Sequence, residues 1–136
     1  MAEKARGKKI LLVEDDEPLR EMFSAVLSKV GYSVDPAKHG LEAIQKLKLT
    51  SYDLILTDMN MPYVDGIDLY LNSIEKHPHM KGRFLFMSGH FPLEVLENRS
   101  LIVKKFLVKP FKPKDLVQFV DSILAETAKG GAEMRA

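Results

Sequence analysis

Apolar residues in this chain form two kinds of segment that alternate along it. Short continuous apolar runs occupy residues 10–13, 54–56, 84–87 and 106–108, and a weaker run occupies residues 32–36. Continuous runs of this length are typical of strands that are buried on both faces of a parallel sheet. The pattern therefore predicts five strands, each followed by a helical segment.

The segments between the runs have apolar residues at spacings of three and four, which is the period of an amphipathic helix. We predict four clear helices and a short one at residues 92–98. Apolar positions that mark the clear helices are Leu19, Met22, Phe23, Val26, Leu27 and Val30, then Leu41, Ile44 and Leu47, then Ile67, Leu71 and Ile74, and finally Leu116, Val117, Val120, Ile123 and Leu124. Pro18 suits the first turn of the first helix, with Asp16 or Glu17 near its cap.

This alternation of strands and helices predicts the α/β class. Right-handed crossovers between parallel strands produce an open, doubly wound sheet with helices on both faces. Ligands of such sheets bind beyond the carboxyl ends of the strands, where the strand order reverses. A functional site is therefore expected at that edge.

Length and composition limit the function further. A chain of 136 residues with 46% hydrophobic and 29% charged residues is expected to form one globular domain, here residues 9–127 between flexible tails at 1–8 and 128–136. The net charge of +1 provides no general attraction to nucleic acid or to an anionic membrane. The absence of cysteine excludes disulfides and thiolate sites, and it fits a cytoplasmic location. No apolar run reaches the length of a membrane span.

Polar residues follow four of the predicted strands directly. Glu14 and Asp15 come after the first strand, Asp58 after the third, Ser88 after the fourth and Lys109 after the fifth. Because the carboxyl ends of parallel strands meet at one edge, we expect these side chains to lie together. A lone aspartate at a strand end usually forms a cap or a turn, so the prediction depends on the combination.

Carboxylates that converge repel one another unless a cation relieves them. Mg²⁺ suits a site with a few carboxylates, water and phosphate oxygens. Lys109 adds a positive charge, and the Ser88 hydroxyl can donate to an oxyanion. Such groups suit phosphoryl transfer, in which a carboxylate serves as the nucleophile. Asp58 is the best candidate, since it follows the central apolar strand.

Residues 9–127 resemble the receiver domain of two-component response regulators. The segments that carry the resemblance are residues 11–20 (LLVEDDEPLR), 39–43 (HGLEA), 52–62 (YDLILTDMNMP) with Asp65 and Gly66, 87–89 (MSG) and 106–111 (FLVKPF). The resemblance implies a flavodoxin-like fold with strand order 2-1-3-4-5. It also implies a signalling domain, not an enzyme, whose own chemistry is limited to phosphorylation and autodephosphorylation.

For the site, the resemblance implies that Asp58 accepts a phosphoryl group from a sensor histidine kinase or a phosphotransfer protein. Asp15 is then a direct Mg²⁺ ligand, Glu14 a ligand through water, and the Asn60 backbone carbonyl completes the protein ligands around Asp58. Lys109 contacts the phosphoryl group, and its bond to Pro110 is expected to be cis.

For signalling, the resemblance implies that Ser88 turns toward the phosphoryl group and that Phe106 swings inward. An unknown output protein then binds the surface formed by residues 92–127. Asn60 and His90 would tune the lifetime of the phosphoryl group. Residues 94–105 contain no glycine, unlike the usual pattern of the family, so this departure affects the output surface and leaves the phosphorylation chemistry intact.

Several of these residues also have ordinary structural explanations. Asp16 and Glu17 fit acids at a helix start, Ser88 could be a turn serine, and Phe106 could belong to the core. His90 is equally compatible with an exposed loop and with a role in gating water.

Two further histidines, His77 and His79, flank Pro78 in a predicted loop and are expected to face solvent. Their spacing does not make a metal site without further ligands.

Two other functions are compatible with part of this pattern. A metal-dependent phosphate-ester hydrolase would use the same acids, but the chain lacks an Asp-x-Asp after the first strand and a phosphate loop. A pure interaction module would bind partners without phosphate, and failure to bind Mg²⁺ would favour it. The chain is expected to be a stand-alone receiver, a phosphorelay shuttle or a part of a larger kinase.

Overall fold

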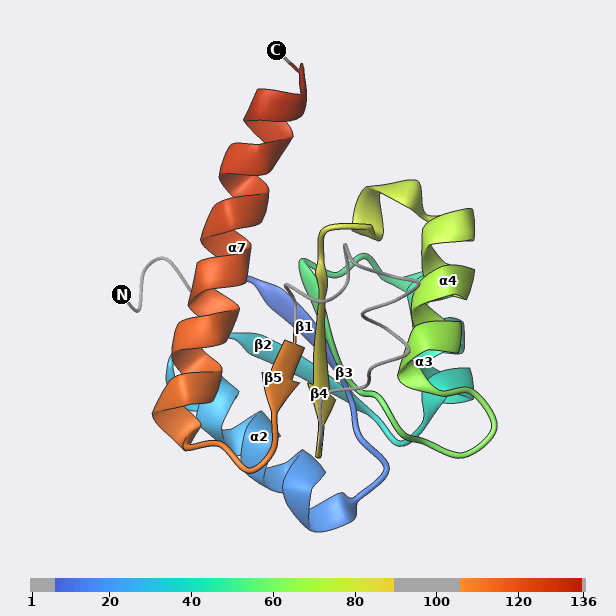
Figure 1. The fold of residues 1–136 in the computed structure, drawn as a ribbon, viewed down its shortest axis with the longest axis vertical. Helices are drawn as coiled ribbons and strands as arrows, with labels where there is room; N and C mark the ends of the chain where they lie inside the picture. The colour runs from blue at the N-terminus through green and yellow to red at the C-terminus, as the bar shows by residue number, and fades with distance from the viewer. Residues whose placement is uncertain (1–6, 90–105, 136) are drawn as a thin grey trace.

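The sheet of this protein is five-stranded, parallel and in the order β2-β1-β3-β4-β5. The computed structural model describes residues 7–89 and 106–135, with side chains in the last helix as far as Glu126. Strand bounds are β1 (Lys9–Val13), β2 (Ser33–Ala37), β3 (Leu54–Asp58), β4 (Phe84–Ser88) and β5 (Phe106–Val108). The α/β class and the strand order 2-1-3-4-5 are therefore confirmed (Figure 1).

Four α-helices in the described part of the chain cover the two faces of the sheet (Figure 1). Their bounds are α2 (Glu17–Lys29), α3 (Gly40–Leu49), α4 (Gly66–Lys76) and α7 (Pro113–Arg135), and a short 3₁₀ helix η1 (Pro78–Met80) follows α4. Figure 1 shows α2 and α7 on one face and α3 and α4 on the other.

The three central strands β1, β3 and β4 bury side chains on both faces, which explains why their apolar runs are continuous. Ile10 and Leu12 pack in the core beneath α2 and α7, whereas Leu11 and Val13 pack in the core beneath α3 and α4. All four residues are fully buried. Successive residues of a strand point to opposite faces, so a strand covered on both sides needs apolar residues at every position.

Three helices start with a side chain that accepts a free backbone N–H of the first helical turn. Oδ1 of Asp16 accepts the Leu19 N–H at 3.0 Å before α2, and Oδ1 of Asp65 accepts the Asp68 N–H at 2.9 Å before α4. Nδ1 of His39 accepts the Glu42 N–H at 3.2 Å before α3. Asp16 therefore has the helix-capping role that its position suggested.

The extent of the last helix differs from the prediction. The α7 helix continues to Arg135, whereas a tail was expected from residue 128 because of Gly130 and Gly131. Glycine lowers helix propensity by about 1 kcal/mol but does not forbid the helical conformation, and no proline follows to end the helix. The domain boundary at 127 stays a prediction, and the helix predicted at 92–98 lies outside the described residues. Across residues 7–89 and 106–135, the helices are too short or too polar to cross a bilayer.

Candidate functional site

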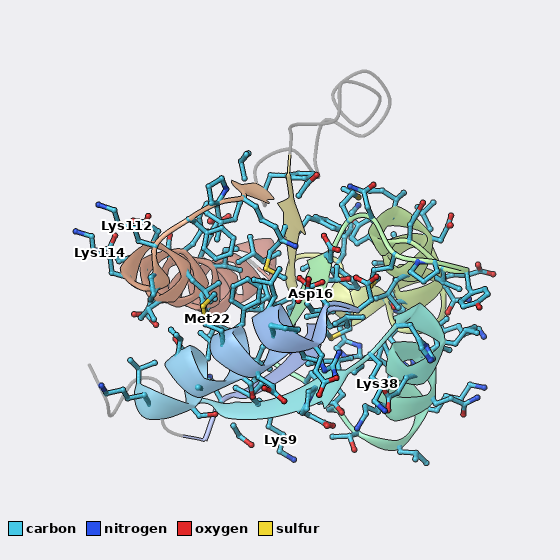
Figure 2. All side chains as sticks on the ribbon, turned by 90° about the horizontal axis from the view of Figure 1, so that it is seen from below. Lys9, Asp16, Met22, Lys38, Lys112 and Lys114 are labelled. Carbon is cyan, nitrogen blue, oxygen red and sulfur yellow. The ribbon has the colours of Figure 1, made fainter. Side chains whose placement is uncertain are left out.

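A cluster of three carboxylates lies at the carboxyl edge of the sheet. The β1 and β3 strands are hydrogen-bonded neighbours, with Val13 opposite Thr57, so Glu14 and Asp15 emerge next to Asp58. One carboxylate oxygen of each residue lies within 4.8 Å of the others. Figure 2 views the molecule from this edge, with Asp16 near the middle. The structure thus brings together the acids that the sequence predicted as a group.

The ammonium group of Lys109 lies between two of these acids. Its Nζ is 2.9 Å from Oε1 of Glu14 and 3.4 Å from Oδ1 of Asp58. Lys109 follows β5, and its backbone N–H donates to the Ser88 carbonyl at 2.6 Å, which ties it to the end of β4. The Lys109–Pro110 peptide bond is cis, as predicted. Lys109 therefore points into the site and not into solvent.

Burial changes the titration of these groups. Glu14 is fully buried and Asp58 is 7% exposed, and this desolvation raises the pKa of both carboxyl groups. Lys109 opposes the rise in both, while the negative charge of Asp15 adds to it at Asp58. Burial also disfavours the charge on Lys109, but Glu14 and Asp58 outweigh it and hold the pKa of Lys109 above its usual value. One ammonium is thus shared by two acids, and a further cation would relieve the excess negative charge.

Backbone and side-chain donors hold the two buried acids in place. Arg20, in the first turns of α2, donates from Nη1 to the Glu14 carbonyl at 2.9 Å. The Asp16 N–H lies 3.3 Å from Oε2 of Glu14, and the Asn60 N–H donates to the Asp58 carboxylate. Sequence reasoning did not assign a role to Arg20, although its position shortly after the acidic pair could have suggested one.

Gly66 is a second residue whose role only the structure reveals. A Cβ at this position would lie 2.7 Å from the Asp58 carbonyl oxygen and 3.0 Å from Cα of Met59. The Gly66 N–H also donates to the Met59 carbonyl at 2.9 Å. The start of α4 is therefore packed against the backbone that carries Asp58, and only glycine fits this approach.

Ser88 and Phe106 lie on the neighbouring strands β4 and β5. Ser88 is 1% exposed, next to Met87, which is opposite Asp58 in the sheet. Phe106 is 7% exposed, and its ring stacks on Phe86 with centroids 5.6 Å apart. Phe106 therefore has the core position that its strand pattern suggested, and its movement on phosphorylation stays a prediction.

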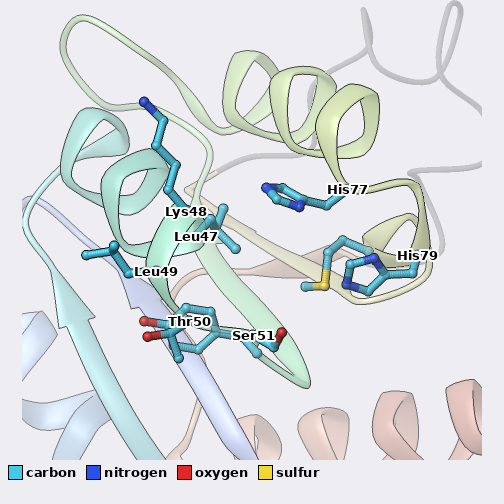
Figure 3. Close-up of a pocket in the computed structure, with 9 residues that line it drawn as sticks. Leu47, Lys48, Leu49, Thr50, Ser51, His77 and His79 are labelled. Atoms are coloured by element: carbon cyan, nitrogen blue, oxygen red, sulfur yellow. The ribbon is translucent and has the colours of Figure 1, made fainter.

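The predicted histidines do not join the acid cluster. His90 lies outside the described residues. His79 is exposed as expected, whereas His77 is half-buried at the end of α4. Both line a hollow of about 220 Å³ at the opposite edge of the sheet, which has no acidic side chain in its lining (Figure 3). Among the described residues, the acid cluster is the one group of three or more His, Cys, Asp or Glu side chains placed to share a metal ion.

Comparisons with known proteins agree with this architecture. The family model for the response regulator receiver domain matches residues 10–121. The response regulator receiver protein CpdR of Brucella abortus is 36% identical over 119 residues, which cover 86% of this chain and 97% of CpdR. The fold and these matches define the class of the protein as a receiver domain. The chain belongs to the response regulator receiver domain family.

Solved structures confirm the fold. A CheY-like receiver domain protein from Methanospirillum hungatei superposes with a TM-score of 0.81 at 27% identity and covers 90% of this chain and 98% of that one. The response regulator TrrA of Thermotoga maritima, solved in complex with Mg²⁺ and BeF, has a TM-score of 0.72 at 25% identity and covers 85% of this chain and 98% of that one. The predicted family and the flavodoxin-like fold are therefore confirmed.

Proposed function

We propose that Asp58 accepts a phosphoryl group from a phosphohistidine of a sensor histidine kinase or a phosphotransfer protein. The observation that carries the proposal is the position of Lys109, whose ammonium lies within 3.4 Å of both Glu14 and Asp58. A lysine from the end of one strand held between acids from the ends of two others is costly as a purely structural arrangement, since it requires desolvation of all three charges. It suits a site where a phosphoryl group arrives.

The donor set of the cluster fits Mg²⁺. Carboxylate oxygens are hard ligands, and burial raises the pKa of Glu14 and Asp58, so a cation that neutralised their negative charge would be favoured here. Asp15 and Asp58 would bind the ion directly, Glu14 through water, and Asn60 through its carbonyl oxygen. When bound, Mg²⁺ would neutralise charge on the phosphoryl oxygens.

The residues of the chain have distinct parts in the transfer. A carboxylate oxygen of Asp58 attacks phosphorus, the new P–O bond forms, and the P–N bond to the donor imidazole breaks with its electron pair leaving on nitrogen. Lys109 then has a phosphoryl oxygen to contact in addition to Glu14. The Ser88 hydroxyl donates to another phosphoryl oxygen.

The same chemistry makes the domain a switch rather than an enzyme with a separate substrate. Hydrolysis of the aspartyl phosphate returns Asp58 to its starting state, and Asn60 and His90 tune the rate of that hydrolysis. Rearrangement of Ser88 and Phe106 passes the change to an output protein at the surface formed by residues 92–127. The domain acts in the cytoplasm without direct contact with nucleic acid or membrane.

Incubation with acetyl phosphate and Mg²⁺ tests the proposal. We expect intact-mass spectrometry to show one added phosphoryl group that acid or base removes, and chelation of Mg²⁺ should prevent the addition. An Asp58→Asn variant should not be labelled. The matched control is Asp16→Asn, since asparagine caps a helix as well as aspartate and the residue lies beside the site.

Two results would contradict the proposal. One is an unchanged mass of the wild-type protein with acetyl phosphate, and the other is equal labelling of Asp58→Asn. Sustained turnover of a generic phosphate ester would instead support a hydrolase.

A further inference from the structure

Tyr63 combines a strained backbone with an exposed aromatic side chain. It lies in the loop between β3 and α4 with φ of 70°, and it is the one non-glycine residue with positive φ in the described part of the chain. Its side chain is also among the most exposed large hydrophobic groups, with 86% of the residue surface accessible. Each property is unfavourable for the isolated domain.

The backbone conformation at Tyr63 follows from the packing of its neighbours. Val64 is seated against Gly40, where an added Cβ would lie 2.8 Å from the valine side chain. The Val64 N–H donates to the Pro62 carbonyl at 2.8 Å, and the Gly66 N–H donates to the Met59 carbonyl at 2.9 Å. The loop is therefore held on both sides of Tyr63, and the left-handed turn is required whichever residue occupies the position.

Tyrosine is a poor choice for such a turn. Glycine adopts positive φ without steric cost and asparagine with little cost, whereas a bulky residue there is a genuine outlier. Contacts inside the domain offset little of this conformational strain, because most of the tyrosine surface is in water. A strained residue at a functional site is a reason to look for a function of its side chain.

The location of Tyr63 indicates what that function is. The loop begins directly after Asp58 and lies at the carboxyl edge of the sheet, together with the loops that carry Glu14 and Lys109 (Figure 1). Asp58 is only 7% exposed, so a protein that delivers a phosphoryl group must cover this edge closely. A small phosphodonor can reach Asp58 without touching an outward-pointing loop side chain. Exposed tyrosines are frequent anchors in protein interfaces.

We propose that Tyr63 is a contact residue for the protein phosphodonor and packs its ring against the surface around the phosphohistidine. The proposal rests on the phosphoacceptor function proposed above. It assigns Tyr63 to donor recognition and not to the chemistry at Asp58.

Replacement of Tyr63 by asparagine separates the two roles. We expect Tyr63→Asn to raise the melting temperature by roughly 2 to 4 °C, because asparagine relieves the backbone strain. Phosphorylation by acetyl phosphate should keep its wild-type rate. Transfer from the autophosphorylated histidine kinase that is fastest for the wild type, chosen from all kinases of the source genome, should slow by about five- to tenfold.

Two control variants sharpen the result. Tyr63→Phe keeps the ring and should retain most of the transfer rate. Leu49→Asn removes an equally exposed apolar side chain, 87% accessible, at the opposite edge of the sheet and should change neither donor reaction.

Each other outcome contradicts the proposal. Equal transfer from the kinase to wild type and Tyr63→Asn would exclude a contact, and slower labelling by both donors would place Tyr63 in the site itself. A lower melting temperature would mean that Tyr63 has a structural role. Failure of the proposed function is distinguishable, since acetyl phosphate would then label neither protein, and absence of transfer from every kinase would exclude a kinase donor.

Discussion

At the scale of single residues, Lys109 determines how much negative charge the site can hold. Its side chain is 21% exposed, whereas the Glu14 side chain beside it is 1% exposed. Water can therefore stabilise a negative charge on Glu14 only slightly, and the ammonium group of Lys109 provides most of the stabilisation. Because both Glu14 and Asp58 have a raised pKa even with Lys109 present, removal of the lysine charge should affect stability in a pH-dependent way.

Lys109→Met removes the charge and keeps the length of the side chain. We expect it to lower the free energy of unfolding by about 1 to 3 kcal/mol at neutral pH, less than for a fully buried pair because the ammonium is partly hydrated. An acid whose pKa is raised by folding contributes to the stability of the folded state at pH values below its ordinary pKa. This contribution disappears as the pH rises through the raised pKa. Lys109→Met should raise the pKa of Glu14 and of Asp58 further. The stability lost by the variant should therefore be largest at pH values above both raised pKa values, and it should become smaller as the pH falls toward 4.5, the ordinary pKa of Glu14.

Urea denaturation at about pH 7.5 and about pH 4.5 measures this difference. Lys112→Ala, a change of an exposed lysine in the same connection, should have little effect at either pH. A loss of stability for Lys109→Met that is equal at both pH values would show that packing, and not charge, explains the effect.

At the scale of secondary-structure elements, the loop and helix after β3 control the position of Asp58. The α4 helix begins at Gly66, with Asp65 as its capping residue, and its first turn touches the backbone of Asp58 and Met59. The same loop presents Tyr63 and seats Val64 on the start of α3. One connection therefore links Asp58 to two helices on one face of the sheet.

Gly66→Ala tests this link. The added methyl group would lie 2.7 Å from the Asp58 carbonyl oxygen, which is backbone and cannot rotate away. We expect a loss of about 1 to 3 kcal/mol of stability and slower labelling by acetyl phosphate, because α4 and Asp58 must move apart. Thermal unfolding and intact-mass kinetics measure the two effects.

Gly89→Ala is the matched control for Gly66→Ala. A Cβ at Gly89 would meet no atom of the described residues within 4 Å, so this variant should keep its stability. Equal effects of the two alanine variants would mean that loss of chain flexibility, and not the close approach to Asp58, is responsible.

At the scale of the whole molecule, two separate hydrophobic cores stabilise the sheet, one on each face. One contains Leu11 and Val13 with residues of α3 and α4, and the other contains Ile10 and Leu12 with residues of α2 and α7. The described buried residues of α7 are Leu116, Val120 and Ile123, all before residue 127. These three side chains anchor the described part of α7, as far as Glu126, to the sheet.

A chain that ends at Thr127 should be as stable as the full chain to within about 0.5 kcal/mol, since it retains the three buried α7 residues that the structure describes. The Ile123→Ala variant of the full chain should lose about 2 to 4 kcal/mol, because Ile123 is 2% exposed and leaves a cavity. Urea denaturation of the three proteins compares them. A large loss on truncation would place the domain boundary after residue 127.

Much of the site could be predicted because its residues follow strands whose apolar runs are continuous. Asp58, Glu14, Asp15 and Lys109 were placed at one edge by that pattern alone, and the structure brings them within a few ångströms. The roles of Arg20 and Gly66 were not predicted, because each depends on a close contact with the backbone of another segment, at Glu14 for Arg20 and at Asp58 for Gly66.

The amino-acid sequence by itself determined the order of the elements, the side chains that each strand buries and the identity of the acids at the strand ends. These properties depend on local periodicity and on the geometry common to all parallel sheets. Only the tertiary structure decided that Lys109 lies closer to Glu14 than to Asp58, that α4 rests on the Asp58 backbone and that Tyr63 is held at positive φ. Those features arise where separate segments meet, because the space left by one segment sets the conformation of the other.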